Sequence, residues 1–356
     1  MFVAWKDLRF ARGRFALMGT VIVLITVLVG LLSGLTAGLG RENTSAITSL
    51  PADHLVFSAP ADGGTVSFAD SRLPGKSVRG WSQVPGVESA EPLGIATAKA
   101  EAGSRTAALS AFAVRSGSRL APEAGKIADG RAVLSQQAAD DLGARAGDAI
   151  TLGGRTVRVA AVSGAAMYSH TPVIWTSLGD WRALPGGSGG ATVLALTTSG
   201  SPDLAAADEK LGTRTVTAAA ALDGIGSYTA ENGSLQLMRG FLFAISALVI
   251  GAFFTVWTIQ RSGDVAVLKA LGASTGYLLK DALGQAVVLL VLGTGVGTAL
   301  AAGLGAAVGG TVPFVLDPST VLVPALIMIA LGAVGAALSI RRITSVDPLT
   351  ALGSVR

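Results

Sequence analysis

Few residues of this 356-residue chain could perform catalysis, and their spacing fits no enzyme motif. The absence of cysteine excludes disulfides, thiolate metal sites and cysteine nucleophiles. The only two histidines, His54 and His170, lie too far apart in the sequence for an H-E-x-x-H zinc motif. Residues 75–77 read Gly-Lys-Ser, the end of a phosphate-binding P-loop, but Asp70 stands where that motif needs its first glycine. We therefore expect no catalytic residue, no bound metal and no ATP hydrolysis by the chain itself.

The hydropathy of the chain predicts a membrane protein. Half of its residues are hydrophobic and 14% are charged, with a mean hydropathy of +0.59, which is too apolar for an ordinary soluble domain. Four stretches without charged residues or histidine are long enough for a helix to cross a bilayer, which takes about 20 residues. The first stretch is too long for the apolar part of a cleaved signal peptide, so we expect it to be retained.

The predicted fold class is an α-helical membrane protein with four transmembrane helices in a 1+3 arrangement and an inserted α+β extracytoplasmic domain. In chain order, the expected segments are an N-terminal amphipathic helix (1–14), transmembrane helix 1 (15–40), the extracytoplasmic domain (41–235), transmembrane helix 2 (236–260), a cytoplasmic loop (261–281), transmembrane helix 3 (282–308), a short outer loop (309–319), transmembrane helix 4 (320–340) and a cytoplasmic tail (341–356).

Basic residues near the ends of the spans predict the orientation. The N-terminal segment, the loop between the second and third spans and the tail together hold 10 Lys and Arg against 4 acidic residues, while the rest of the chain holds 17 against 19. Because basic residues concentrate on the cytoplasmic side, we expect that loop and both termini in the cytoplasm. This distribution explains the formal net charge of +4 without nucleic-acid binding.

The region between the first two spans carries the signals of a small α+β domain. Runs rich in β-branched residues, such as 156–159 and 191–196, are separated by Gly and Pro and predict strands. Helices are expected around 135–142 and 201–211. Gly153-Gly154 predicts a tight hairpin turn.

The loop between the second and third spans contains a short amphipathic helix. Ser262 or Asp264 is placed to cap it, and Gly272 to end it. Val265, Leu268 and Leu271 recur at helical spacing and line one face. So short a helix is unstable alone, so we expect a partner to bury this face; a helix lying on the membrane surface is the alternative.

Four segments resemble the ABC-transporter permeases of the macrolide-exporter type, the superfamily that includes FtsX, and within it the heme-exporter permeases. The similar segments are Ala4-Trp5-Lys6-Asp7-Leu8-Arg9-Phe10, the run 138–152, the loop 260–274, and the tail with Arg341-Arg342, Asp347-Pro348 and Ala351-Leu352.

The resemblance implies partners and a location. A separate cytoplasmic P-loop ATPase, in two copies, would bind ATP and dock on the short helix, here called the coupling helix. The permease would be a homodimer in the bacterial cytoplasmic membrane. Glycines one helical turn apart in the first span are the expected dimer contact. The coupling residues are Asp264, Val265, Leu268, Lys269, Leu271 and Gly272, and the glycines are Gly30, Gly34 and Gly38.

Heme would then be the transported substrate, with no intrinsic cofactor. Tyr, His and Glu side chains bind heme iron, and Arg binds propionates. Tyr228 and Glu231, at i and i+3 before the second span, would share one helix face. The remaining candidates are Tyr168, His170 and Arg239, although Tyr and Arg near a span end also serve as interface anchors.

Two other functions fit the same sequence. One is export of drugs, peptides or lipids. The other is FtsX-like signalling, in which the extracytoplasmic domain activates a cell-wall hydrolase and nothing crosses the membrane.

Overall fold

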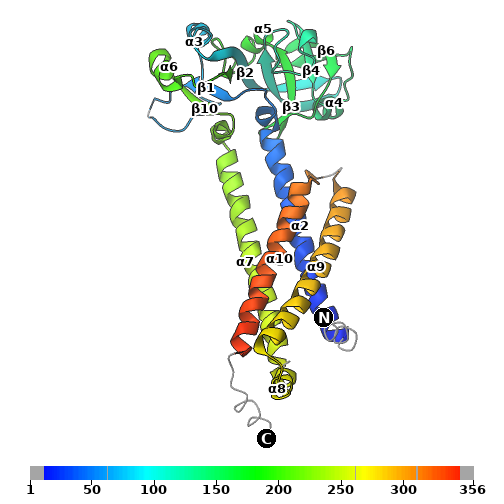
Figure 1. The fold of residues 1–356 in the computed structure, drawn as a ribbon. Helices are drawn as coiled ribbons and strands as arrows, with labels where there is room; N and C mark the ends of the chain where they lie inside the picture. The colour runs from blue at the N-terminus through cyan, green and yellow to red at the C-terminus, as the bar shows by residue number, and fades with distance from the viewer. Residues whose placement is uncertain (1–11, 62, 261, 310–311, 345–356) are drawn as a thin grey trace. The chain divides into compact units, whose positions relative to one another are not determined.

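The computed structural model describes residues 12–61, 63–260, 262–309 and 312–344 and divides into two compact units, most of whose elements are labelled in Figure 1. We call Leu39–Gly233 the inserted domain, and the residues up to Gly38 with those from Ser234 onward the helical unit. Most of the expected amphipathic helix over 1–14 and of the tail over 341–356 lies outside the described residues.

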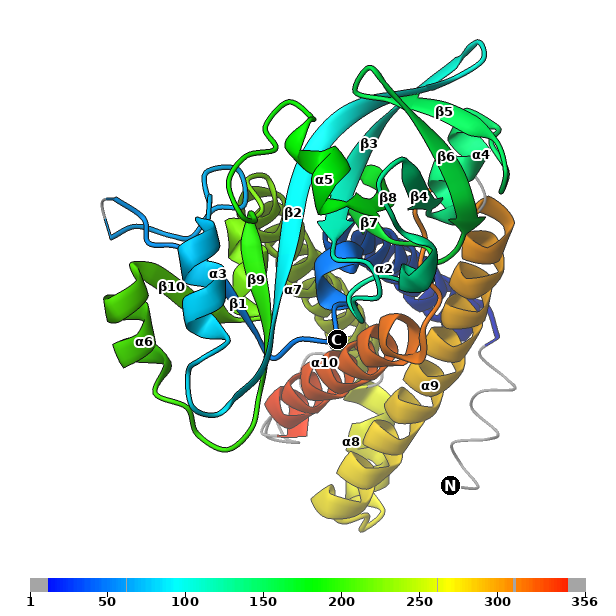
Figure 2. The ribbon, with the colours of Figure 1, turned by 90° about the horizontal axis from the view of Figure 1, so that it is seen from above.

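The inserted domain is built on a ten-stranded mixed sheet (Figure 2). Its strands are β1 (His54–Ser58), β2 (Val87–Ala102), β3 (Arg105–Val114), β4 (Arg131–Leu134), β5 (Ala149–Leu152), β6 (Arg155–Val162), β7 (Met167–Tyr168), β8 (Thr171–Ser177), β9 (Val193–Thr198) and β10 (Thr213–Thr217). Their spatial order is β10-β1-β9-β2-β3-β8-β4-β6-β5, and β7 pairs with β8.

The long strand β2 belongs to both parts of this sheet. Its first half pairs with β9 and its second half with β3. Near its end, Ala100 also pairs with Leu152 of β5. This last pairing joins the ends of the series that runs from β2 to β5, so these strands form a closed circuit.

Short helices flank the sheet. They are α3 (Gly75–Trp81), α4 (Gln136–Leu142), α5 (Leu178–Arg182) and α6 (Leu204–Leu211), with the 3-10 turns η1 (Ala124–Lys126) and η2 (Ala220–Gly224). Helices α3 and α6 lie side by side (Figure 2). Ser135 caps α4 and Asp203 caps α6, so the helices expected around 135–142 and 201–211 are confirmed. The hairpin over Gly153-Gly154 is confirmed between β5 and β6, and both glycines have positive φ.

Aromatic side chains fill the core of the inserted domain. The Phe112 ring meets those of Tyr168 and Trp175 edge-on, with centroids 5.3 and 5.4 Å apart. Ala46 and Ile47, from the end of helix α2 (Arg12–Thr48), are fully buried in the same cluster. The last turns of this helix therefore belong to the domain core.

Four long helices and one short helix make up the described part of the helical unit. They are α2, α7 (Tyr228–Gln260), α8 (Ser262–Ala270), α9 (Thr275–Val308) and α10 (Pro318–Thr344). Each long helix contains a stretch long and apolar enough to cross a membrane. Large apolar side chains such as Leu248, 74% exposed, cover their outer faces, as contact with lipid requires.

All four long helices extend beyond the predicted spans, α2, α7 and α9 by the most. Helix α2 continues to Thr48, α7 begins at Tyr228, and α9 begins at Thr275, where Ser274 caps it. Charged and polar residues end the apolar pattern that predicts a span. They do not interrupt the backbone hydrogen bonds of the helix.

Small residues let α2 and α9 approach closely. A methyl group added to Gly293 or Gly297 would come within 2.8 Å of Ile22 or within 2.7 Å of Thr26. Further along, one added to Gly30 would lie 2.8 Å from Ala301. The helices can take these positions only because the side chains are absent.

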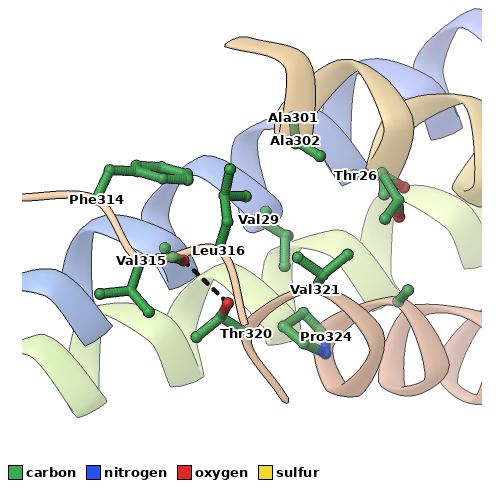
Figure 3. A pocket seen from close by; sticks show the side chains of 14 residues that line it. Thr26, Val29, Ala301, Ala302, Phe314, Val315, Leu316, Thr320, Val321 and Pro324 are labelled. Carbon is green, nitrogen blue, oxygen red and sulfur yellow. Dashed lines mark hydrogen bonds between the residues drawn. The ribbon is translucent and has the colours of Figure 1, made fainter. Parts of the chain in front are cut away.

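The segment between α9 and α10 is seated against α2. The Phe314 ring lies between Gly34 and Gly305, where a methyl on either glycine would overlap the ring. Val315 donates its backbone N–H to the Gly34 carbonyl at 3.1 Å, and the Thr320 hydroxyl donates to the Val315 carbonyl at 3.0 Å (Figure 3). Beside the ring lies a cavity of about 10 Å³, room for roughly one water molecule.

The glycine ridge expected at a dimer contact is filled from within the chain. Gly30 faces Ala301, Gly34 faces Phe314, and Gly38 faces the backbone of Pro313. The close approach that this ridge permits is therefore made inside one chain, and we place no dimer contact on it.

The Phe314 contact gives a stability prediction. Gly305→Ala should destabilise the helical unit by about 1–3 kcal/mol, because the methyl overpacks against the ring. The measurement is the thermal midpoint Tm of the purified chain in detergent.

Gly303→Ala is the matched control, because a methyl there meets nothing within 4 Å. Phe314→Leu in the Gly305→Ala background should recover part of the loss. Equal Tm values for Gly305→Ala and Gly303→Ala would show that the Phe314 ring does not pack against Gly305.

Candidate functional site at the 168–171 hairpin

The candidate site is organised by a tight hairpin between β7 and β8. Tyr168 pairs with Thr171, which leaves Ser169 and His170 as the two turn residues. Both have left-handed backbone conformations, with φ of 48° and 59°. Glycine is the usual residue there, so the neighbouring structure must hold this turn in place.

The end of helix α2 provides that support. The N–H of Ser169 donates to the carbonyl of Asn43 at 3.0 Å, and the N–H of His170 donates to the carbonyl of Glu42 at 3.3 Å. The Ser45 hydroxyl accepts from the N–H of Met167 at 2.9 Å. The hairpin is thus hydrogen-bonded to three residues within one turn of α2.

These contacts bring His170 between two carboxylates. Its Nε2 lies 2.9 Å from Glu231 Oε2, on α7, and its Nδ1 lies 3.6 Å from Glu42 Oε2. Asn43 Nδ2 donates to the same Glu231 oxygen at 2.9 Å. The side chains of His170, Glu42 and Glu231 are 35%, 34% and 44% exposed, so a ligand can reach them. We call His170, Glu42, Asn43 and Glu231 the hairpin cluster.

The hairpin cluster can coordinate a cation or a metal-containing ligand through imidazole nitrogen and carboxylate oxygen. Within the described residues, no group of three or more His, Cys, Asp or Glu side chains has the arrangement that would hold a metal ion.

Of the residues predicted from sequence, the structure brings together His170 and Glu231. Tyr168 lies apart from them in the core, 9% exposed, with its ring against Phe68 and Phe112. Burial raises the pKa of its phenol above the ordinary value, so the group stays neutral.

Two other predicted residues have different surroundings. Tyr228 is half-buried and packs against the core of the inserted domain. Arg239 belongs to the helical unit, where its guanidinium lies 5.8 Å from the centre of the Phe243 ring.

Glu42 and Asn43 were not foreseeable from the sequence. They follow the predicted end of the first span at residue 40, and 127 or more residues separate them from His170. Their role becomes visible only because α2 continues as a helix.

The second candidate segment is helix α8, for which the resemblance predicts the role of a coupling helix. Val267, Leu268 and Leu271 are 56%, 37% and 79% exposed. Gly272 ends the segment with φ of 94°, as predicted, and the Ala273 N–H donates to the Leu268 carbonyl at 3.0 Å. Lys269 is half-buried, whereas the side chains of Asp264 and Val265 lie outside the described residues.

Four long apolar helices in a 1+3 order, an inserted α+β domain and a short helix between the second and third spans define a membrane protein with one large inserted domain. Residues 15–214 match the MacB-like periplasmic core domain family, and residues 237–348 match the FtsX-like permease C-terminal family. The chain belongs to the MacB/FtsX family of ABC-transporter permeases, and it is an integral membrane protein.

Curated relatives span the whole chain. A protein of Staphylococcus haemolyticus named as the hemin transport system permease HrtB is 28% identical, and the match covers 100% of both chains. One with the same name from Staphylococcus epidermidis is 24% identical over 99% of each chain. An uncharacterized ABC transporter permease of Mycobacterium bovis is 27% identical over 99% of each.

Two solved structures are similar to part of the chain. The extracellular domain of the ABC-type transporter YknZ covers 47% of this chain and 98% of its own, with 11% identity and a TM-score of 0.35. The periplasmic region of MacB from Actinobacillus actinomycetemcomitans covers 51% and 94%, with 12% identity and a TM-score of 0.36.

Burial of Tyr168 predicts a pH dependence. The unfolded chain loses the phenolic proton near the ordinary pKa of 10.0, while the folded domain keeps it. This contribution to stability is therefore complete below pH 10 and is lost as the pH rises further. We expect Tm to fall more steeply above pH 10 in the wild type than in Tyr168→Phe. Parallel Tm curves for the two proteins from pH 8 to 11 would contradict the burial of the Tyr168 phenol.

Proposed function

We propose that this chain is the permease subunit of a heme exporter powered by a separate ATPase. The observation that carries the proposal is the hairpin cluster, in which His170 and Glu231 converge at 2.9 Å on an accessible surface. Whole-length similarity to permeases named for hemin transport supports it.

The chemistry of the cluster suits heme. Four of the iron's coordination positions are filled by the porphyrin, so the protein needs to supply only one or two axial ligands. His170 offers an imidazole nitrogen, and Glu231 and Glu42 offer carboxylates. Tyr168 supports the hairpin from the core, and we give it no contact with the porphyrin.

Binding iron at His170 breaks the hydrogen bond from its Nε2 to Glu231. An exposed side-chain contact of this kind contributes at most about 1 kcal/mol, so the exchange is inexpensive. Asn43 still donates to the freed Glu231 oxygen, which keeps that carboxylate oriented. Without heme, His170 is therefore hydrogen-bonded to Glu231, and heme iron would replace Glu231 as the partner of the imidazole.

The ATPase docks on the coupling helix. A helix of nine residues needs a partner to be stable, and the exposed Val267 within it and Leu271 directly after it offer that partner an apolar contact. The distribution of basic residues supports a cytoplasmic location of this helix and of both termini. Two permease copies with two ATPases form the working assembly in the bacterial cytoplasmic membrane.

A hemin titration tests the substrate. The purified chain should shift the Soret absorption band of hemin saturably, and both His170→Ala and Glu231→Gln should weaken the affinity at least tenfold, because each removes an iron-binding group.

Glu101→Gln is the matched control for this titration, since the exposed Glu101 lies in the same domain and forms an ion pair with Lys99. Wild-type protein that gives no saturable shift would remove heme as the substrate. Export of drugs, peptides or lipids, or signalling without transport, would then be the remaining functions.

Docking of the ATPase is tested at Leu271. Leu271→Asp should lower the affinity for the partner ATPase at least tenfold, because a carboxylate would be buried in an apolar contact. Leu271→Met, which keeps the contact apolar, should bind like the wild type. Unchanged co-purification of the ATPase with Leu271→Asp would exclude this face as the docking surface.

A further inference from the structure

A second cavity lies in the inserted domain and shares no residue with the hairpin cluster. It has a volume of about 300 Å³, the lower end of the range for sites that hold small molecules. Strands β2 and β9, the segment before η1 and the turn after α2 form its walls. Its charged lining residues are Glu88, Glu91 and Arg119, and its apolar ones include Pro51 and Leu120.

A bulge in β2 brings the two glutamates to the same cavity. Residues three apart on a regular strand point to opposite faces of the sheet. Here Val87 pairs with Thr198 and Ser89 with the adjacent Thr197, so Glu88 is an extra residue between them. Bulges of this kind redirect a side chain and are common beside binding sites.

Among the described residues, the charged side chains that line the cavity form no ion pairs with one another or with other side chains. Within the described part of the chain, Glu91 Oε2 is inaccessible to solvent and receives no hydrogen bond. Glu88, Glu91 and Arg119 form no ion pair with any described residue, although all three line one cavity. A buried carboxylate oxygen without a partner is costly, so a water molecule, an ion or a bound ligand is needed to satisfy it.

We propose that this cavity binds a basic amino acid. Two carboxylates and one guanidinium are complemented by two ammonium groups and one carboxylate, which is the charge pattern of lysine or ornithine. The ammonium groups would meet Glu88 and Glu91, and the carboxylate would meet Arg119 in paired hydrogen bonds. The apolar wall at Pro51 and Leu120 accommodates the aliphatic stem. This site is independent of heme export.

The test is calorimetric titration of the full chain in lipid nanodiscs with three probes. L-Lysine should bind saturably, whereas L-norleucine, which lacks the second ammonium, and cadaverine, which lacks the carboxylate, should bind at least tenfold more weakly. No saturable heat with L-lysine, or equal affinity for all three probes, would overturn the proposal.

Variants assign the binding to this cavity. Glu91→Gln and Arg119→Gln keep a polar side chain at each position, and each should weaken L-lysine binding at least tenfold. Glu88→Gln, at an exposed position, serves if Glu91→Gln does not fold. Glu101→Gln should bind like the wild type, and hemin binding should be unchanged in every variant. Wild-type affinity for L-lysine in Glu88→Gln and Arg119→Gln would overturn the proposal.

Discussion

The structure depends on the requirement that a backbone inside a bilayer satisfies its own hydrogen bonds. This requirement makes every span a helix, and a helix need not end where its apolar pattern does. Helix α2 runs on to Thr48 and α7 starts at Tyr228, so polar residues at both helix ends become part of the inserted domain. Glu42, Asn43 and Glu231 reach the 168–171 hairpin in this way.

The balance of energies in the hairpin cluster favours exchange of partners over rigidity. Ser169 and His170 hold left-handed conformations that cost of order 1 kcal/mol each, and backbone hydrogen bonds to α2 offset this cost. The side-chain pair from His170 to Glu231 is exposed and weak by comparison. The backbone therefore fixes the position of the imidazole, while its partner can change. That combination suits the proposed role, in which a ligand is bound and then released.

The sequence was sufficient to predict the four spans, the 1+3 order and the short helix ended by Gly272, because hydropathy and capping residues act locally. It was not sufficient for contacts between distant segments. The spacing of Gly30, Gly34 and Gly38 predicts a close approach but does not identify the partner, which proved to be Ala301, Phe314 and Pro313 of the same chain. Tyr168 likewise has the chemistry of an iron ligand, and only the packing of the sheet shows that it is buried. Glu42 lies at the site because α2 continues past residue 40, and no apolar pattern in the sequence predicts this extension.

Transport itself is the most direct test of the account. Proteoliposomes loaded with heme in their membrane, and carrying this chain with its partner ATPase, should lose heme to an external acceptor only when ATP is hydrolysed. Glu231→Gln should abolish the loss while ATP hydrolysis continues. Hydrolysis of ATP by the wild-type assembly without any release of heme would contradict the account.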